Sequence, residues 1–125
     1  MEFSFPKKEK LKSKKLIEAL FAEGKSVSSH PLKLVYLQTE LPFDVNVQAG
    51  VTVPKKNFKS AVKRNRIKRL MRESYRLNKA IVFNNSKGTF AFLFLYLGKE
   101  IPTYDSVSVH MKLVLEKFNK KISHE

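Results

Sequence analysis

The stretch AVKRNRIKRLMRESYR, from Ala61 to Arg76, holds seven basic residues and a single acidic residue, Glu73. Like charges three and four residues apart repel one another on a helix. The stretch nevertheless has the period of an α-helix with one buried side, formed by Ile67, Leu70, Met71, Ser74 and, one residue beyond the stretch, Leu77. We therefore expect a helix that packs on a sheet by this side and presents its charge on the other.

The charged side of this helix is nearly continuous. At about 100° per residue, six polar positions fall within about 140° of arc, and we call them the basic stripe: Arg64, Asn65, Lys68, Arg69, Arg72 and Arg76. Arg64 is expected to project into solvent. An ordinary solvated face mixes both signs of charge, whereas the stripe contains no acidic residue. We therefore predict that it binds a polyanion, and its arginines favour bidentate contacts with phosphate.

The net charge is concentrated in the same region. The chain carries +14, from 25 Lys and Arg against 11 Asp and Glu, and residues 55–76 alone carry +9. About two-thirds of the net charge thus lies in 22 residues, which is typical of an electrostatic binding surface. The predicted polyanion-binding set adds four residues to the stripe: Lys55, Lys56, Lys59 and Arg66.

Length and composition predict one domain over residues 1–125. Cysteine is absent, which excludes disulfides and thiolate metal sites and favours a reducing compartment. The first fifteen residues have no continuous apolar run, so we expect no signal peptide. The longest apolar run, residues 90–97, is too short to span a bilayer. These features predict a cytoplasmic protein that does not insert into a membrane.

Periodicity and capping signals predict the remaining elements. Ser13 would cap a helix over residues 14–23 that Gly24 ends. Residues 31–38 read as a strand. Residues 44–54 alternate and place Val45, Val47, Ala49, Val51 and Val53 on one face. Ser60, or a residue near it, would open the basic helix, which runs to about Asn78. Residues 87–98 contain a central strand, and Asp105 or Ser106 begins a last helix.

This order, a helix, two or three strands, a helix, a strand and a helix, predicts a small two-layer α+β domain. The last helix would bury Val107, Met111, Val114 and Phe118. Because a strand follows the basic helix and must rejoin the sheet, that helix should pack on one sheet face.

The segment VTVPKK (51–56) followed by AVKRNRIKRLMRESYR resembles the signature of the bacterial ribonuclease P protein subunit. Arg64-Asn65-Arg66, Lys68-Arg69 and Arg72-Glu73 match the basic helix of that family in sequence. The likeness extends to the N-terminal basic segment and helix, and it covers the whole chain in element order. Two features depart from the family pattern: the loop NFKS (57–60) lacks the usual glycine and is one residue longer, and Ile17 replaces the first of two helix aromatics.

The resemblance implies an α-β-β-β-α-β-α order with a left-handed βαβ crossover, an exception to the usual handedness, in a ribosomal-protein-like fold. It implies a subunit of a tRNA-processing endoribonuclease whose chemistry is done by RNA and Mg²⁺, the Mg²⁺ being held mainly by the RNA. The implied partners are the catalytic RNA and precursor tRNA, with neither DNA nor a membrane. The basic helix would lie against the catalytic RNA, and a cleft between the sheet and the first helix would hold the 5′ leader.

The aromatic residues allow a finer hypothesis about that cleft. Phe21 lies four residues beyond Ile17 on one face of the first helix. One interpretation places both side chains in the core. The other is that Phe21 and Ile17, with Val35 or Tyr36 from the first predicted strand, form a cleft where unpaired bases stack. Such stacking tolerates any base sequence, as variable leaders require.

No catalytic or metal site of the protein's own is predicted. His30, His110 and His124 lie far apart and in no metal-ligand spacing, no pair of acidic residues suggests an acid and a base, and there is no glycine-rich phosphate loop. The alternative function is a small structural RNA-binding protein of ribosomal type. It would use the same stripe without any dependence on leader length.

Overall fold

The computed structural model describes residues 5–83 and 88–123 of the chain. Its elements follow the order 3₁₀ turn η1 (Lys7–Glu9), α1 (Lys14–Glu23), β1 (Lys25–Ser29), β2 (Leu32–Gln38), β3 (Val47–Thr52), α2 (Ala61–Asn78), α3 (Ala80–Phe83), β4 (Phe90–Tyr96) and α4 (Tyr104–Ser123). The longer elements confirm the predicted α-β-β-β-α-β-α order. No helix in the described ranges is long and apolar enough to cross a membrane.

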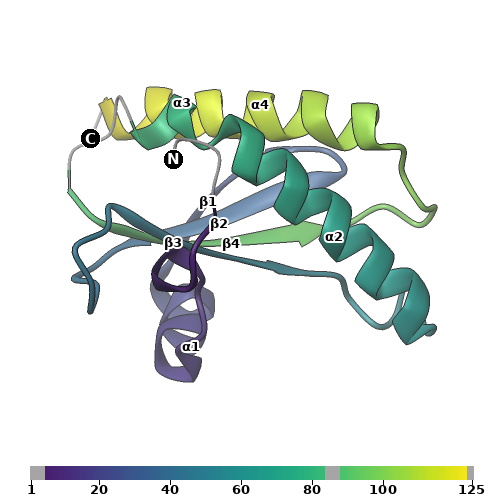
Figure 1. Ribbon diagram of the computed structural model, residues 1–125, viewed down its shortest axis with the longest axis horizontal. Helices are drawn as coiled ribbons and strands as arrows, with labels where there is room; N and C mark the ends of the chain where they lie inside the picture. Colours follow the sequence, from purple (N-terminus) through teal and green to yellow (C-terminus); the bar gives the residue numbers. More distant parts are fainter. Residues whose placement is uncertain (1–4, 84–87, 124–125) are drawn as a thin grey trace.

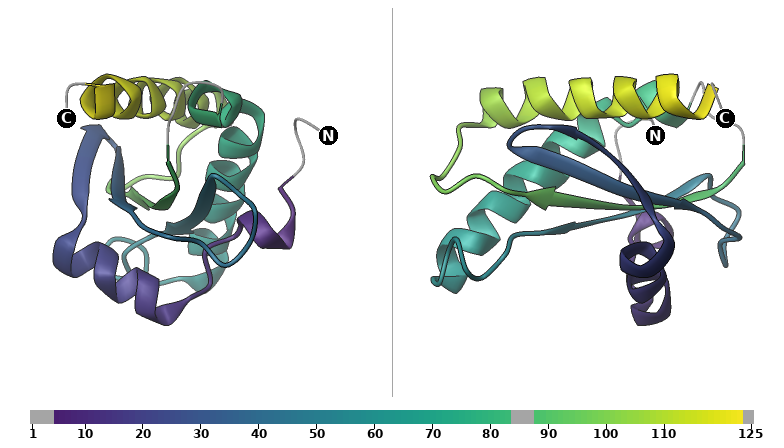
Figure 2. Two further views of the ribbon diagram at one scale, coloured as in Figure 1. Left: turned by 90° about the vertical axis from the view of Figure 1, so that its left-hand side faces the viewer. Right: turned by 180° about the vertical axis from the view of Figure 1, so that it is seen from behind.

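The four strands form one sheet in the order β1-β2-β4-β3. β1 pairs antiparallel with β2, β2 pairs antiparallel with β4, and β3 runs parallel to β4. β3 and β4 are neighbours joined through α2, so they form a βαβ unit. Viewed with these strands pointing away, as in the left panel of Figure 2, the chain passes from β3 over the helical face to β4 anticlockwise. The crossover is therefore left-handed, as the resemblance implied.

Helices cover both faces of this sheet. α2 and α4 lie on one face, and α1 crosses the other (Figures 1 and 2). The larger core lies between the sheet and α2 with α4, and its fully buried side chains include Phe92, Phe94, Ile67, Met71 and Phe118. A smaller cluster under α1 contains Leu11, Leu20, Val35, Ala91 and Leu93. Alternate residues of β4 thus pack into the larger core and into the cluster under α1, which is why the sequence of β4 is apolar on both faces.

The helix ends follow the predicted capping residues closely. The hydroxyl of Ser13 accepts a hydrogen bond from the N–H of Leu16 (3.2 Å), and that of Ser60 accepts one from the N–H of Lys63 (3.3 Å). Gly24 ends α1, and a Cβ there would lie 2.4 Å from the carbonyl oxygen of Leu20. α4 begins at Tyr104 rather than at Asp105 or Ser106, because Thr103 supplies the capping hydroxyl.

The alternating stretch 44–54 forms a shorter strand than its pattern indicated. β3 covers Val47–Thr52, and Val47, Ala49 and Val53 are buried in the larger core. Val45 precedes the strand and is only half-buried. In the last helix, the predicted buried side of Val107, Met111, Val114 and Phe118 is confirmed.

Candidate nucleic-acid interface

Helix α2 supports the predicted basic stripe by burying its other side. Ile67, Met71, Ser74 and Tyr75 are buried against the sheet and α4, together with Asn78. Ile67 and Met71 confirm the predicted orientation, and Leu70 is half-buried against the same core. Leu77, which the helical period placed on the buried side, is 39% exposed instead. The buried face of α2 is therefore narrower than the pattern indicated.

The outer side of α2 and the loop before it gather exposed cations. Seven predicted RNA-binding residues are exposed: Lys55, Lys56, Lys59, Asn65, Arg66, Arg69 and Arg72. The other three, Arg64, Lys68 and Arg76, are half-buried. Lys63, which belongs to neither the stripe nor the predicted RNA-binding set, is also exposed. These side chains lie in one stretch of chain, so they form an extended positive surface suited to a phosphate backbone.

Arg64 does not project freely into solvent, and that expectation was wrong. Its Nη1 donates hydrogen bonds to the carbonyl oxygens of Phe58 (2.8 Å) and Lys59 (2.9 Å). Arg64 follows directly on the first turn of α2, so its side chain can reach back to the loop that precedes the helix. The guanidinium therefore holds the Asn57–Ser60 loop in place, and the side chain of Phe58 anchors the same loop in the core.

At the C-terminal end of the stripe, Arg76 forms an ion pair with a residue outside the stripe. Arg76 donates hydrogen bonds to the carboxylate of Glu73, which lies three residues earlier on α2. These hydrogen bonds and the guanidinium charge lower the pKa of Glu73, and the same contact raises the pKa of Arg76. Glu73 therefore offsets one positive charge at the C-terminal end of the stripe and leaves the N-terminal end strongly positive.

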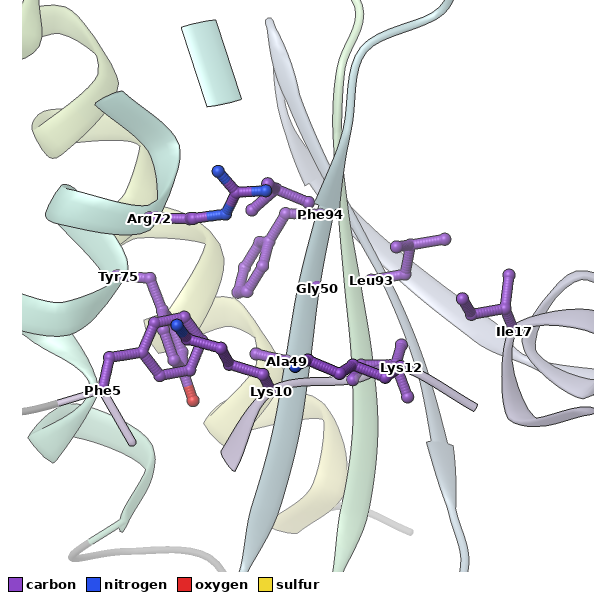
Figure 3. A pocket seen from close by; sticks show the side chains of 12 residues that line it. Phe5, Lys10, Lys12, Ile17, Ala49, Gly50, Arg72, Tyr75, Leu93 and Phe94 are labelled. Carbon is purple, nitrogen blue, oxygen red and sulfur yellow. The ribbon is translucent and has the colours of Figure 1, made fainter. Parts of the chain in front are cut away.

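A hollow of about 220 Å³ lies beside the stripe, at the edge of β3 (Figure 3). Lys10 and Lys12 line it from the N-terminal segment, Arg72 from α2, and Ile17 from α1, with the rings of Phe5 and Tyr75 at one end. We call it the edge hollow. It joins the basic side of α2 to the face of the sheet that α1 covers, so one RNA strand could contact both.

The N-terminal segment that forms this hollow is fixed to the rest of the fold. The N–H of Leu11 donates to the carbonyl oxygen of Ala49 (2.9 Å), which adds the segment to the β3 edge. The Nζ of Lys79 lies 2.6 Å from the Oε1 of Glu9, and this pair is largely buried. The Phe5 ring packs edge-on against Tyr75, with centroids 5.5 Å apart. These contacts fix the backbone of the N-terminal segment, and its lysine side chains therefore project from a defined position.

Sequence reasoning did not assign these lysines to a site. The lysine-rich run PKKEKLKSKK was visible as a basic N-terminus. The alternation at Lys10 and Lys12 is also typical of an extended segment that displays one kind of side chain on one side, whereas Lys8 lies in the preceding turn η1. What the sequence does not reveal is that this segment lies along β3, because that contact joins residues about forty positions apart.

Three of the four predicted cleft residues belong to α1 or to the strand beneath it. Phe21 is 62% exposed, Ile17 is half-buried, and Val35 is buried beneath α1. Phe21 is therefore available to a ligand, which excludes the interpretation that it is a core residue. Val35 forms part of the floor rather than the surface.

Tyr36 belongs to the opposite face, so its assignment to the cleft was wrong. Successive residues of a strand point to opposite sides of the sheet, and Val35 points toward α1. Tyr36 accordingly packs in the larger core, where its ring centroid lies 4.9 Å from that of Phe118 on α4. It is 2% exposed and cannot offer a stacking surface next to Phe21.

The described residues contain no group of three or more His, Cys, Asp or Glu side chains placed to hold a metal ion. His30 and His110 lie within the described ranges, and the Nδ1 of His110 is 2.9 Å from the hydroxyl oxygen of Ser29. His124 lies outside the described residues.

Comparison with known proteins agrees with this geometry. The family model described as Ribonuclease P matches residues 5–119. A ribonuclease P protein component of Porphyromonas gingivalis is 35% identical over 113 residues, which cover 88% of this chain and 82% of the relative. One from Chlorobaculum tepidum is 34% identical and covers 97% of this chain and 79% of the relative.

Two solved structures share the fold. The RNase P protein of Staphylococcus aureus superposes with a TM-score of 0.70 at 19% identity and covers 88% of this chain and 94% of the other. The RNase P protein of Thermotoga maritima also gives a TM-score of 0.70, at 22% identity, and covers 87% and 96%. At these identities the structural likeness bears on the fold alone.

Proposed function

This chain belongs to the ribonuclease P protein family, and from that premise we propose that it binds the catalytic RNA of ribonuclease P and the 5′ leader of precursor tRNA. As a ribonuclease P protein component, it is a subunit of a tRNA-processing ribonuclease and has an RNA partner. The observation that carries the proposal is the arrangement of its surfaces. Arg72 of the positive helix α2 and Ile17 of α1 line the same edge hollow, and the exposed Phe21 lies one helical turn beyond Ile17.

The two surfaces suit two kinds of RNA. The exposed stripe residues and the loop lysines can contact a phosphate backbone without reading its sequence, which suits a large folded RNA. Phe21 offers an apolar ring on which an unpaired base can stack. Stacking needs single-stranded nucleotides, so this second surface suits the leader rather than the folded body of a tRNA.

Mg²⁺ is proposed to be held mainly by the RNA partner, which would do the chemistry. Mg²⁺ takes oxygen ligands, often carboxylates. Two acidic side chains lie at this surface, one on α2 and one in η1 against the C-terminal end of α2, and both already form ion pairs. Glu73 pairs with Arg76, and Glu9 pairs with Lys79. The residues of this surface therefore do not fit a resident Mg²⁺, and their surplus of positive charge disfavours one. A role on precursor tRNA also supports the cytoplasmic location inferred from the sequence.

Two measurements test this proposal. RNA that copurifies with the protein should be sequenced, and a single structured RNA with ribonuclease P features is expected. The purified protein should then be added to that RNA with a precursor tRNA, and cleavage at the mature 5′ end should be measured across Mg²⁺ concentrations. The protein should lower the Mg²⁺ concentration that half-maximal cleavage requires. Copurification of ribosomal RNA, with no effect on cleavage, would instead favour the structural RNA-binding alternative.

A further inference from the structure

A second hollow also contacts the N-terminal lysine segment. It has a volume of about 280 Å³, and its lining is Lys7, Lys8, Lys10, Lys12, Ser13, Pro42, Phe43 and Gln48. We call it the Phe43 hollow. Four of these residues are cations, and none of the described residues in the lining is acidic. Phe43, from the loop between β2 and β3, is 55% exposed, so its ring is accessible to a ligand.

The Phe43 hollow is built on a fixed backbone. The Nε2 of Gln48, a buried residue of β3, donates a hydrogen bond to the carbonyl oxygen of Lys8 (3.0 Å). Glu9, the acidic residue within the lysine run, is turned away into its ion pair with Lys79. The carboxylate of Glu9 is thus already neutralised, and the lysine charges remain to act on a ligand.

The two hollows share residues. Lys10 and Lys12 line both the edge hollow and the Phe43 hollow. Ile17, one helical turn before Phe21, also lines the edge hollow. A strand lying on the exposed face of α1 could therefore pass Lys12 and Lys10 and reach Phe43 while staying close to cations.

From this continuity we propose that the Phe43 hollow binds the distal, single-stranded nucleotides of the 5′ leader, with a base stacked on Phe43 and phosphates near Lys7 and Lys8. This rests on the proposed function, because it extends the leader path beyond the α1 face. An exposed aromatic ring among lysines is the arrangement that binds unpaired nucleic acid without sequence preference. Leader recognition would then depend on leader length as well as on the nucleotides next to the cleavage site.

The first test uses the isolated protein and a fluorescein-labelled oligoadenylate of about twelve nucleotides, a length within the usual range for such sites. Phe43→Ala should weaken binding about five-fold or more, as the loss of one stacked base predicts. Phe43→Tyr, which keeps the ring, should bind like the unchanged protein. Equal affinity of the Phe43→Ala protein would overturn the proposal.

The second test uses the holoenzyme and precursor tRNAs that carry leaders of about three or about twelve nucleotides. Phe43→Ala should weaken binding of the long-leader substrate only. Lys7→Gln with Lys8→Gln should do the same and reduce the salt dependence, by about 0.7 in log–log slope for each phosphate that is no longer neutralised. The matched control is Lys112→Gln with Lys120→Gln, which removes the same charge from the exposed surface of α4 and should spare leader-length dependence.

The outcomes separate this inference from the proposed function. If Phe43→Ala weakens both substrates equally, or weakens binding of the catalytic RNA itself, the hollow contacts that RNA and the leader assignment is wrong. If no holoenzyme forms with the catalytic RNA, the proposed function fails, and the oligoadenylate measurement still decides whether the Phe43 hollow binds single-stranded RNA. Melting temperatures of all variants should match that of the unchanged protein, because the substituted side chains are exposed.

Discussion

Arg64 and Arg66 occupy the same Arg-Asn-Arg motif yet have different surroundings. The guanidinium of Arg64 is bound to the carbonyl oxygens of Phe58 and Lys59, whereas Arg66 is exposed. Arg64→Ala should therefore lower the free energy of unfolding by about 1–2 kcal/mol, because it removes charged hydrogen bonds to the loop. Arg66→Ala should change it by less than about 0.5 kcal/mol.

Urea denaturation of both variants, with catalytic-RNA binding measured at several salt concentrations, checks this difference. Arg66→Ala should weaken RNA binding and reduce the log–log salt slope by about one unit. Equal stability of the two variants would show that the loop does not depend on Arg64. Unchanged RNA affinity of Arg66→Ala would remove Arg66 from the interface.

Tyr75 gives the fold a predictable response to alkaline pH. Burial, and to a smaller degree the carboxylate of Glu9, raise the pKa of its phenol well above the ordinary value near 10. Because the folded-state pKa is raised, the stabilisation is complete below the unfolded-state pKa and is lost as pH rises above it. The free energy of unfolding should fall above about pH 10.

The matched variant for this effect is Tyr75→Phe, which keeps the ring and removes the ionisable hydroxyl. Its free energy of unfolding should decline less steeply than that of the unchanged protein between about pH 10 and pH 11. Denaturant titrations at several pH values measure both slopes. Parallel curves would mean that Tyr75 does not control alkaline stability.

At the scale of elements, the N-terminal turn η1 depends on a contact with the far end of α2. The pair between Lys79 and Glu9 is largely buried, and the Lys79 ammonium also lies 5.2 Å from the centroid of the Phe83 ring. Lys79→Met should lower the free energy of unfolding by about 3 kcal/mol, because Glu9 would remain as a buried charge without its partner. Thermal or urea denaturation measures this loss.

The control variant removes both charges of the ion pair, so that neither remains buried without a partner. Lys79→Met combined with Glu9→Leu removes both charges, and it should recover much of the stability that the single variant lacks. The single variant should also bind oligoadenylate more weakly, since η1 carries two lysines of the Phe43 hollow. A Lys79→Met protein of full stability would show that the N-terminal segment is held by its β3 contacts alone.

At the scale of the whole molecule, the proposal assigns RNA binding to two separate surfaces. Substitutions in the stripe should affect all substrates equally, because the stripe is proposed to bind the catalytic RNA. Substitution of Phe21 should affect only substrates with a leader, because Phe21 is proposed to stack on unpaired bases. Phe21→Ala is therefore expected to weaken binding of a precursor tRNA with a leader by about 1–3 kcal/mol and to spare leaderless tRNA.

Because Phe21 is exposed, an effect of Phe21→Ala on binding can be separated from an effect on stability. At 62% exposed, its truncation should change stability by less than about 0.5 kcal/mol. Val109→Ala is a suitable control, since Val109 is similarly exposed on α4, across the sheet from α1. Equal weakening with and without a leader would show that Phe21 contributes to assembly rather than to leader recognition.

Local patterns determined much of this protein. The Ser13 and Ser60 caps, the stop at Gly24 and the buried positions Ile67 and Met71 depend on residues within a turn or two of one another. Such short-range rules can be read along the chain. The concentration of positive charge in residues 55–76 is likewise a property of the sequence alone. It predicts a polyanionic ligand without reference to the fold.

The tertiary structure decided on which face of the sheet each candidate residue lies and which residues it contacts there. Tyr36 was separated from Val35 because neighbouring strand residues point to opposite faces. Arg64 was tied to its loop because the chain turns back beneath the helix start. The N-terminal lysines became part of the candidate interface only when Leu11 paired with Ala49 and Glu9 with Lys79. These contacts join residues 38 and 70 positions apart, and no local periodicity records such distances along the chain.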